Sequence, residues 1–153
     1  MVIFENIYED NFERIVFCYD KCVGLKFIIV IHNMVLGPVT GGCCMWDYKT
    51  EDEVIMDVFR FFKGMTYKAS ILKLSMGGGK SVIIGDVSKK TPALLQRFGE
   101  FVEELCGGYV MVKDVGINSV DLKIVKSRTS YIFGIDGESN SFGDFLFVMV
   151  WGV

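Results

Sequence analysis

The sequence lacks the features that would direct it to a membrane or to nucleic acid. Its longest uninterrupted apolar run, residues 145–151, is far shorter than the roughly 20 residues that a membrane-spanning helix needs. A formal net charge of −3 provides no basic excess for binding phosphate backbones. The opening Met-Val-Ile-Phe-Glu has no basic segment of the kind that starts a signal peptide. We therefore expect a cytoplasmic protein that binds neither a membrane nor nucleic acid.

Disulfide and metal-binding motifs are also missing. The five cysteines, at positions 18, 22, 43, 44 and 106, do not follow the spacing of a disulfide scaffold. None of them forms the Cys-x-x-Cys pair of a zinc site, and adjacent Cys43 and Cys44 are poorly placed to ligate one metal from an extended strand. His32 is the single histidine. We expect buried free thiols and no metal site.

Nucleotide-binding loops are disfavoured as well. Residues 79–81, Gly-Lys-Ser, match the end of a phosphate-binding loop, but Leu74 occupies the position of its first glycine. A predicted strand follows this segment, whereas the loop should begin a helix. No Gly-x-Gly-x-x-Gly fingerprint follows a strand anywhere in the sequence.

The 153 residues are enough for one domain with a sizeable core, and their hydrophobic pattern predicts alternating strands and helices. Thr50 and Glu53 form a capping box ahead of apolar residues at helical spacing, and Thr91-Pro92 begins a second amphipathic helix. We expect helices at 4–12, 54–65, 92–105 and after a Ser119 cap, and strands at 14–20, 25–33 (a hairpin), 41–46, 81–85, 109–112 and 131–134. This order is typical of an α/β fold with a mixed, mostly parallel sheet.

Two lysines in glycine-containing segments are the candidate binding residues. Lys68 ends the segment Lys-Gly-Met-Thr-Tyr-Lys, and Lys80 follows three consecutive glycines. Glycines let a backbone and a ligand approach closely. Asp114 follows a predicted strand, at the edge where open α/β sheets bind ligands. Two ammonium groups and one carboxylate suit an amino-acid substrate, although solvated surface lysines are the alternative interpretation.

Four motifs, spread over nearly the whole chain, carry a family resemblance. The motifs are Gly37-Pro38-x-x-Gly41-Gly42-x-x-Met45-Trp46, Lys63-Gly64-Met65-Thr66-Tyr67-Lys68, Gly77-Gly78-x-Lys80 and Asp114-Val115-Gly116. With these motifs the chain resembles the N-terminal domain of the glutamate/leucine/phenylalanine/valine dehydrogenases, with the leucine dehydrogenases as the most similar members.

The resemblance implies a fold, a reaction and an assembly. It implies a three-layer α/β sandwich in which residues 1–136 form a substrate-binding and dimerisation domain of a homo-oligomer. Residues 137–153 are interpreted as a truncated linker toward a missing dinucleotide-binding domain, which would hold NAD. The implied reaction is the oxidative deamination of a branched-chain, leucine-like L-amino acid to a 2-oxo acid and ammonia.

The resemblance also assigns roles to individual residues. Lys68 binds the substrate carboxylate, Lys80 is the general base that activates water, and Asp114 moves protons to and from the substrate nitrogen. The remaining implied substrate-binding residues are Thr40, Gly41, Gly42 and Met65. The chain departs from the family at Cys43-Cys44, where Thr-Arg is usual, and at Thr40, where an apolar residue is usual.

A second interpretation is a non-catalytic oligomerisation module from a truncated or decaying gene. Residues 144–150 read Asp-Phe-Leu-Phe-Val-Met-Val, where the family continues toward its second domain. Several of the departures are reachable by cytosine-to-thymine codon changes. On this interpretation the domain would associate with itself without catalysing hydride transfer.

Overall fold

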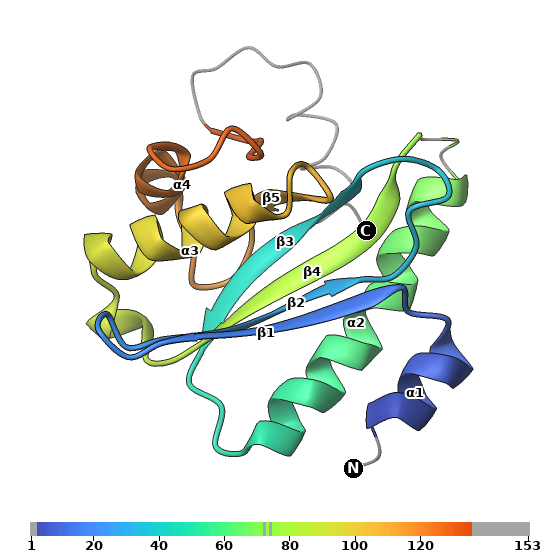
Figure 1. Cartoon of the computed structure of the whole chain (residues 1–153), viewed down its shortest axis with the longest axis horizontal. Helices are drawn as coiled ribbons and strands as arrows, with labels where there is room; N and C mark the ends of the chain where they lie inside the picture. The colour runs from blue at the N-terminus through green and yellow to red at the C-terminus, as the bar shows by residue number, and fades with distance from the viewer. Residues whose placement is uncertain (1–2, 72, 74, 136–153) are drawn as a thin grey trace.

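Five strands form one mixed sheet in the order β1-β2-β4-β3-β5 (Figure 1). The computed structural model describes residues 3–71, 73 and 75–135. The strands are β1 (Arg14–Asp20), β2 (Leu25–Ile31), β3 (Val39–Trp46), β4 (Gly77–Ile84) and β5 (Tyr109–Lys113). The helices are α1 (Ile3–Asp10), α2 (Glu51–Ile71), α3 (Pro92–Glu104) and α4 (Ser119–Lys126), with a short 3-10 turn, η1 (Val87–Lys89).

Strand direction follows the order of the elements. β1 and β2 form the predicted antiparallel hairpin, and β2 also pairs antiparallel with β4. β3 lies between β4 and β5 and runs parallel to both. β1, β3, β4 and β5 therefore point one way and β2 points the other, which confirms the mostly parallel mixed sheet.

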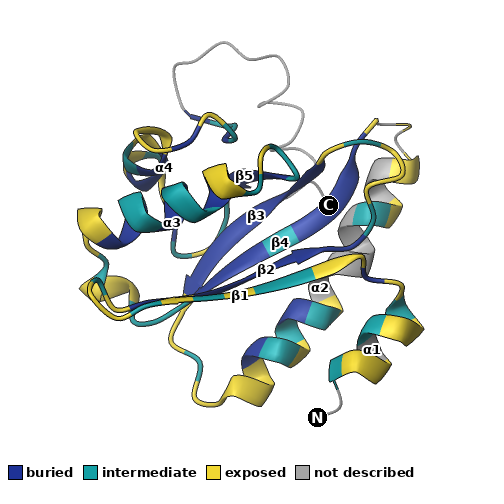
Figure 2. Ribbon diagram, in the orientation of Figure 1, coloured by how far each residue is buried: buried dark blue, intermediate teal, exposed yellow. Residues whose placement is uncertain are grey.

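Helices cover both faces of the sheet, so the domain has three layers (Figure 1). One apolar core, under α3 and α4, includes Phe27, Met45 and Phe98. A smaller core on the α1 and α2 face includes Phe12, Val30 and Val58. Figure 2 shows the central strands buried between these layers and the outer helix faces exposed. The predicted α/β sandwich is confirmed.

Two elements near the predicted site differ from the sequence-based expectation. The expected helix over 54–65 extends to Ile71, so Gly64 lies inside α2, where a glycine costs about 1 kcal/mol relative to alanine. Lys68 is consequently a helical residue rather than a loop residue. The expected strand over 81–85 starts earlier, at Gly77, which places Lys80 within β4 rather than before it.

The glycines ahead of Lys80 serve strand packing. A Cβ at Gly77 would lie 1.8 Å from the Asn33 carbonyl oxygen, and one at Gly79 would lie 2.1 Å from a methyl of Val39. β4 can therefore fit between its neighbours at this end because Gly77 and Gly79 have no side chains. Strand packing accounts for these two glycines, so their presence does not by itself indicate a ligand.

Two smaller expectations were wrong. Asn118, not Ser119, is the N-cap of α4, because the Asn118 side chain accepts from the N–H of Asp121 while the Asp121 side chain accepts from the N–H of Asn118. The expected strand over 131–134 is reduced to one bridge, between Met111 and Ile132.

Three further expectations concern membranes, metals and the end of the chain. Among the described helices, none has the length and apolar character needed to cross a membrane. The described residues also contain no group of three or more His, Cys, Asp or Glu side chains arranged to hold a metal. Residues 137–153 lie outside the described part of the chain, so the domain boundary at residue 136 stays a prediction.

Candidate functional site

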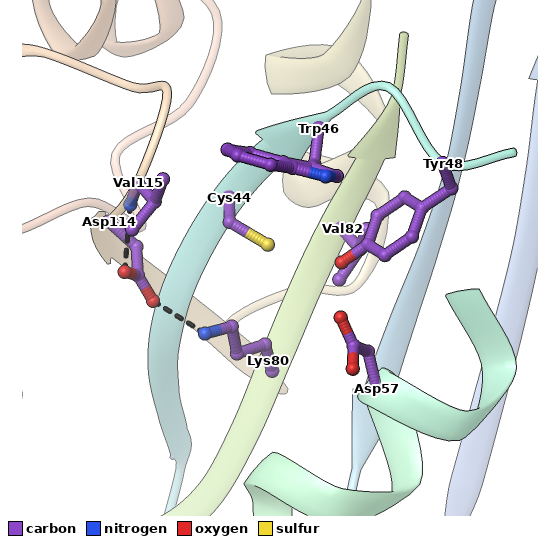
Figure 3. Close-up of a pocket in the computed structure, with 8 residues that line it drawn as sticks. All are labelled: Cys44, Trp46, Tyr48, Asp57, Lys80, Val82, Asp114 and Val115. Carbon is purple, nitrogen blue, oxygen red and sulfur yellow. Dashed lines mark hydrogen bonds and ion pairs between the residues drawn. The ribbon is translucent and has the colours of Figure 1, made fainter. Parts of the chain in front are cut away.

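An ion pair between Lys80 and Asp114 is the centre of the candidate site. Lys80 lies in β4, and Asp114 comes directly after β5, on the far side of β3. The Lys80 Nζ donates to Asp114 Oδ2 across 2.6 Å (Figure 3). Both side chains are largely buried, with exposed fractions of 15% for Lys80 and 11% for Asp114. The structure thus brings together the two residues to which the resemblance gives catalytic roles.

Gly42 makes room for this ion pair. It pairs with Val112 of β5, and the constant register of β3 with β4 places it level with Lys80. A Cβ at Gly42 would lie 2.4 Å from Asp114 Oδ2 and 2.9 Å from the Cβ of Asp114. The two charged side chains therefore meet directly over a position that has no side chain of its own.

The loop after β5 holds the carboxylate in place. The Val115 N–H donates to Asp114 Oδ1 over 2.8 Å, which leaves Oδ2 turned to Lys80. The Ile117 N–H donates to the Asp114 carbonyl over 3.1 Å, and the Met45 N–H donates to the Val115 carbonyl over 2.9 Å. The end of β3 and the turn itself thus both fix the position of Asp114.

Gly41 faces the other side of the sheet, because neighbouring residues of a strand point to opposite faces. Its missing Cβ would lie 1.8 Å from the Gly79 carbonyl oxygen. The buried Tyr109 hydroxyl donates to the Gly41 carbonyl over 2.8 Å and lies 2.9 Å from Ser81 Oγ. Gly41 therefore supports the site from behind, and its contact with a substrate stays a prediction.

The other candidate residues lie nearby or outside the described part. Thr40 is buried and shares the strand face of Gly42, two residues away. Met65 and Lys68 lie in α2, but their side chains are outside the described part of the chain. Whether Lys68 and Met65 converge on the ion pair therefore stays a prediction.

A pocket of about 230 Å³ opens beside the ion pair. Figure 3 shows the rings of Trp46 and Tyr48 along its rim and the Asp57 carboxylate facing it from α2. The pocket is lined by Cys44, Trp46, Tyr48, Asp57, Lys80, Val82, Asp114 and Val115. Sequence reasoning did not identify Cys44, Trp46, Tyr48 or Asp57 as lining residues. Alternation along the strand could have placed Cys44 and Trp46 on the same face as Gly42.

Comparison with known proteins gives the family. The family model of the Glu/Leu/Phe/Val dehydrogenase dimerisation domain matches residues 13–134. The chain belongs to this family of amino-acid dehydrogenases. The resemblance carried by the four motifs is therefore confirmed.

The relatives differ in their substrates. The chain is 43% identical over 145 residues to the leucine dehydrogenase of Geobacillus stearothermophilus, covering 94% of this chain and 40% of that protein. It is 44% identical over 153 residues to the phenylalanine dehydrogenase of Caldalkalibacillus thermarum, covering 99% of this chain and 41% of that protein. The chain thus spans about two-fifths of the length of these relatives.

Solved structures agree on the fold of this dehydrogenase domain. The L-tryptophan dehydrogenase of Nostoc punctiforme matches with a TM-score of 0.85 and 37% identity, covering 87% of this chain and 40% of that chain. A hetero-hexameric glutamate dehydrogenase from Thermus thermophilus matches with a TM-score of 0.64 at 19% identity, covering 82% of this chain and 34% of that chain, and shows the fold alone.

Near neutral pH, two polar groups of the pocket are uncharged in this dehydrogenase domain. Burial raises the pKa of the Cys44 thiol to about 11, although the nearby Lys80 ammonium opposes the shift. Burial raises the pKa of the Tyr48 phenol, and the neighbouring Cys44 and Asp57 raise it further. Neither group is therefore suited to take up a proton from a substrate near neutral pH.

The expectation of buried thiols is correct for only two of the five cysteines. All five are free thiols, but Cys22 and Cys106 are exposed and Cys18 is half-buried. Cys43 and Cys44 are buried, and burial raises the pKa of each. Exposure of Cys22 has a local cause, because it lies in the hairpin turn that follows β1, where its N–H donates to the side chain of Asp20.

Thiol labelling should separate these cysteines. At pH 8 we expect Cys22 and Cys106 to react rapidly with a disulfide reagent, while Cys43 and Cys44 react only after unfolding. A thiol with a pKa of about 11 is ionised to only about one part in a thousand at this pH, and the thiolate is the nucleophile. Mass spectrometry of the labelled peptides with and without denaturant measures the pattern. Rapid native-state labelling of Cys44 would contradict the buried pocket wall.

Proposed function

We propose that this domain binds the substrate of an NAD-dependent amino-acid dehydrogenase that deaminates a leucine-like, branched-chain L-amino acid to a 2-oxo acid and ammonia. The observation that carries the proposal is the Lys80–Asp114 ion pair in the wall of a pocket. Membership of the amino-acid dehydrogenase family supports the reaction class. The leucine-like side chain is our choice among the substrates named for the relatives, supported by the similarity to leucine dehydrogenase.

The chemistry proposed for the site divides between three residues. Lys68 binds the substrate carboxylate as a fixed positive charge. Lys80 is the general base for the attacking water, and Asp114 moves a proton to and from the substrate nitrogen. The 2.6 Å contact between Lys80 and Asp114 supports this division, because a proton can pass directly between groups at hydrogen-bond distance. Thr40, Gly41, Gly42 and Met65 complete the proposed substrate contacts.

The described residues do not fit a dinucleotide site. Phosphates of a dinucleotide bind where a glycine-rich turn opens a helix, whereas residues 77–79 lie inside β4. We therefore assign NAD to none of the described residues and expect a separate domain to hold it. A bound nicotinamide would accept the hydride from the substrate.

Two measurements on the chain of residues 1–153 test the proposal. We expect no NADH formation with L-leucine and NAD, because the described residues offer no nicotinamide site against the substrate.

We expect L-leucine to slow the acetylation of Lys80 by acetic anhydride, as measured by mass spectrometry, while exposed Lys123 reacts at an unchanged rate. D-leucine, with the same charges and the opposite hand, is the matched control. Equal labelling of Lys80 with and without L-leucine would contradict substrate binding.

A second candidate function is assembly alone. The matching family model describes a dimerisation domain, which supports a homo-oligomer. A non-catalytic oligomerisation module would associate in size-exclusion chromatography with light scattering, yet L-leucine would not protect Lys80. Association together with protection supports the substrate-binding proposal over this alternative.

A further inference from the structure

A second buried ion pair lies behind the loop that carries Asp114. Lys90, between η1 and α3, places its Nζ 2.5 Å from the Asp121 Oδ2 in the first turn of α4. The exposed fractions of the two side chains are 12% and 8%. Neither residue lines the pocket beside Lys80, so any effect on that site must pass through the loop between them.

The contacts of this ion pair reach the loop at two points. Lys90 Nζ donates to the Gly116 carbonyl over 2.7 Å, and Asp121 Oδ2 accepts from the Asn118 N–H over 2.8 Å. Gly116 has a φ of +80°, and a Cβ there would lie 2.3 Å from the Met45 carbonyl oxygen. The loop over 114–118 is therefore pressed against the end of β3 and held there from behind by Lys90 and Asp121.

The orientation of the Asp114 carboxylate depends on this loop. Its Oδ1 accepts from the Val115 N–H, and Val115 is the residue directly before Gly116. A shift of Gly116 would turn the Val115 N–H and release Oδ1, so the other oxygen would no longer be directed to Lys80. A charge-assisted hydrogen bond of 2.6 Å requires such fixed geometry at both ends.

We propose that Lys90 and Asp121 are positioning residues that hold the Asp114 carboxylate against Lys80. The proposal rests on the proposed function, because it gives Lys80 and Asp114 their roles in the reaction. Lys90 and Asp121 act through the loop over 114–118 and contact neither of the two reacting groups. A role confined to stability would leave the environment of Lys80 unchanged while the chain stays folded.

The acetylation rate of Lys80 in the 153-residue chain tests the proposal. The amine reacts through its lone pair, so donation to a fixed carboxylate slows the reaction. The double variant K90M/D121N removes both charges together and avoids leaving one buried charge unpaired. We expect Lys80 to react about five-fold faster in this variant, less than the roughly ten-fold or more that loss of a whole charge-assisted hydrogen bond would give, and D114N sets the upper limit of the effect.

A matched control removes a different long-range ion pair. Arg97 of α3 and Asp20 of β1 are 2.8 Å apart at another part of the sheet. The double variant R97M/D20N makes the same change in charge, and we expect the Lys80 rate to stay that of the unmodified chain. Circular dichroism and cooperative unfolding confirm that each variant is folded.

The outcomes separate this proposal from the proposed function. A folded K90M/D121N chain with an unchanged Lys80 rate would overturn the positioning role. If that variant does not fold, D121N alone, which keeps an acceptor for the Asn118 N–H, carries the same test with the same expected direction. Labelling needs no substrate, so a failure of L-leucine to protect Lys80 would overturn the proposed function while leaving the positioning result intact.

Discussion

Substitution of Gly41 by alanine is expected to destabilise the domain by about 3 kcal/mol, the upper end of the range for overpacking a core. The new Cβ would lie 1.8 Å from the carbonyl oxygen of Gly79, and both groups belong to the backbone of paired parallel strands. Neither can rotate away, so β3 and β4 must separate. Their separation would also strain the buried hydrogen bond from Tyr109 to the Gly41 carbonyl.

Urea unfolding of the 153-residue chain measures this effect. Gly108→Ala is the matched control, because its Cβ would lie 3.1 Å from the Leu105 carbonyl oxygen and the residue does not have a left-handed φ. We expect the control to change the free energy of unfolding by less than about 1 kcal/mol, which is ordinary for a substitution without a severe clash. A Gly41→Ala chain as stable as the control would show that the two strands are less tightly paired than the structure indicates.

Helices with complete local signals were predicted well. For α3, Thr91 accepts from the Leu94 N–H over 3.2 Å, Pro92 begins the helix, and Leu94, Leu95 and Phe98 are buried on one face. Each of these features is local, because it depends on residues three or four positions apart. Local spacing therefore determined both the start of the helix and the face that packs on the sheet.

Elements defined by tertiary packing were predicted poorly. The first residues of β4 are glycines, which have no hydrophobic periodicity, and their strand conformation depends on the close approach of Asn33 and Val39. The end of α2 was misplaced because the apolar residues at helical spacing end at Met65, whereas α2 continues to Ile71.

The candidate site was predictable in part. The motifs and the position of Asp114 after a strand predicted that Lys68, Lys80 and Asp114 share one site. The structure brings Lys80 and Asp114 within 2.6 Å of each other, and the place of Lys68 stays a prediction. The remaining pocket wall could not be anticipated in the same way, because Tyr48 precedes α2 and Asp57 lies within it. Residues that meet only through the packing of a helix on a sheet leave no short motif in the sequence.

Gly42→Ala is expected to disconnect Lys80 from Asp114 while the domain stays folded. The new Cβ would lie 2.4 Å from Asp114 Oδ2 and 2.9 Å from Asp114 Cβ. Rotation of the Asp114 side chain toward solvent removes the first contact, and a small shift of the loop after β5 relieves the second, whereas the Gly79 carbonyl beside Gly41 is held within the paired strands. We expect acetylation of Lys80 to become about ten-fold faster and L-leucine to lose its protective effect, since a charge-assisted hydrogen bond is worth about 1.5–3 kcal/mol.

The comparison of the two neighbouring glycines decides between a site effect and a stability effect. Gly41→Ala should lower the free energy of unfolding more than Gly42→Ala, and Gly42→Ala should show the larger Lys80 rate in the folded chain. Both are measured on the same preparations, by urea unfolding and by mass spectrometry of the acetylated peptides. Gly41 and Gly42 belong to the same motif and the same strand. The opposite outcomes expected for the two variants therefore follow from the residues that the glycines face, which are Gly79 for Gly41 and Asp114 for Gly42. Equal losses of stability in the two variants would mean that Asp114 is unable to rotate and that Gly42 is needed for the fold itself.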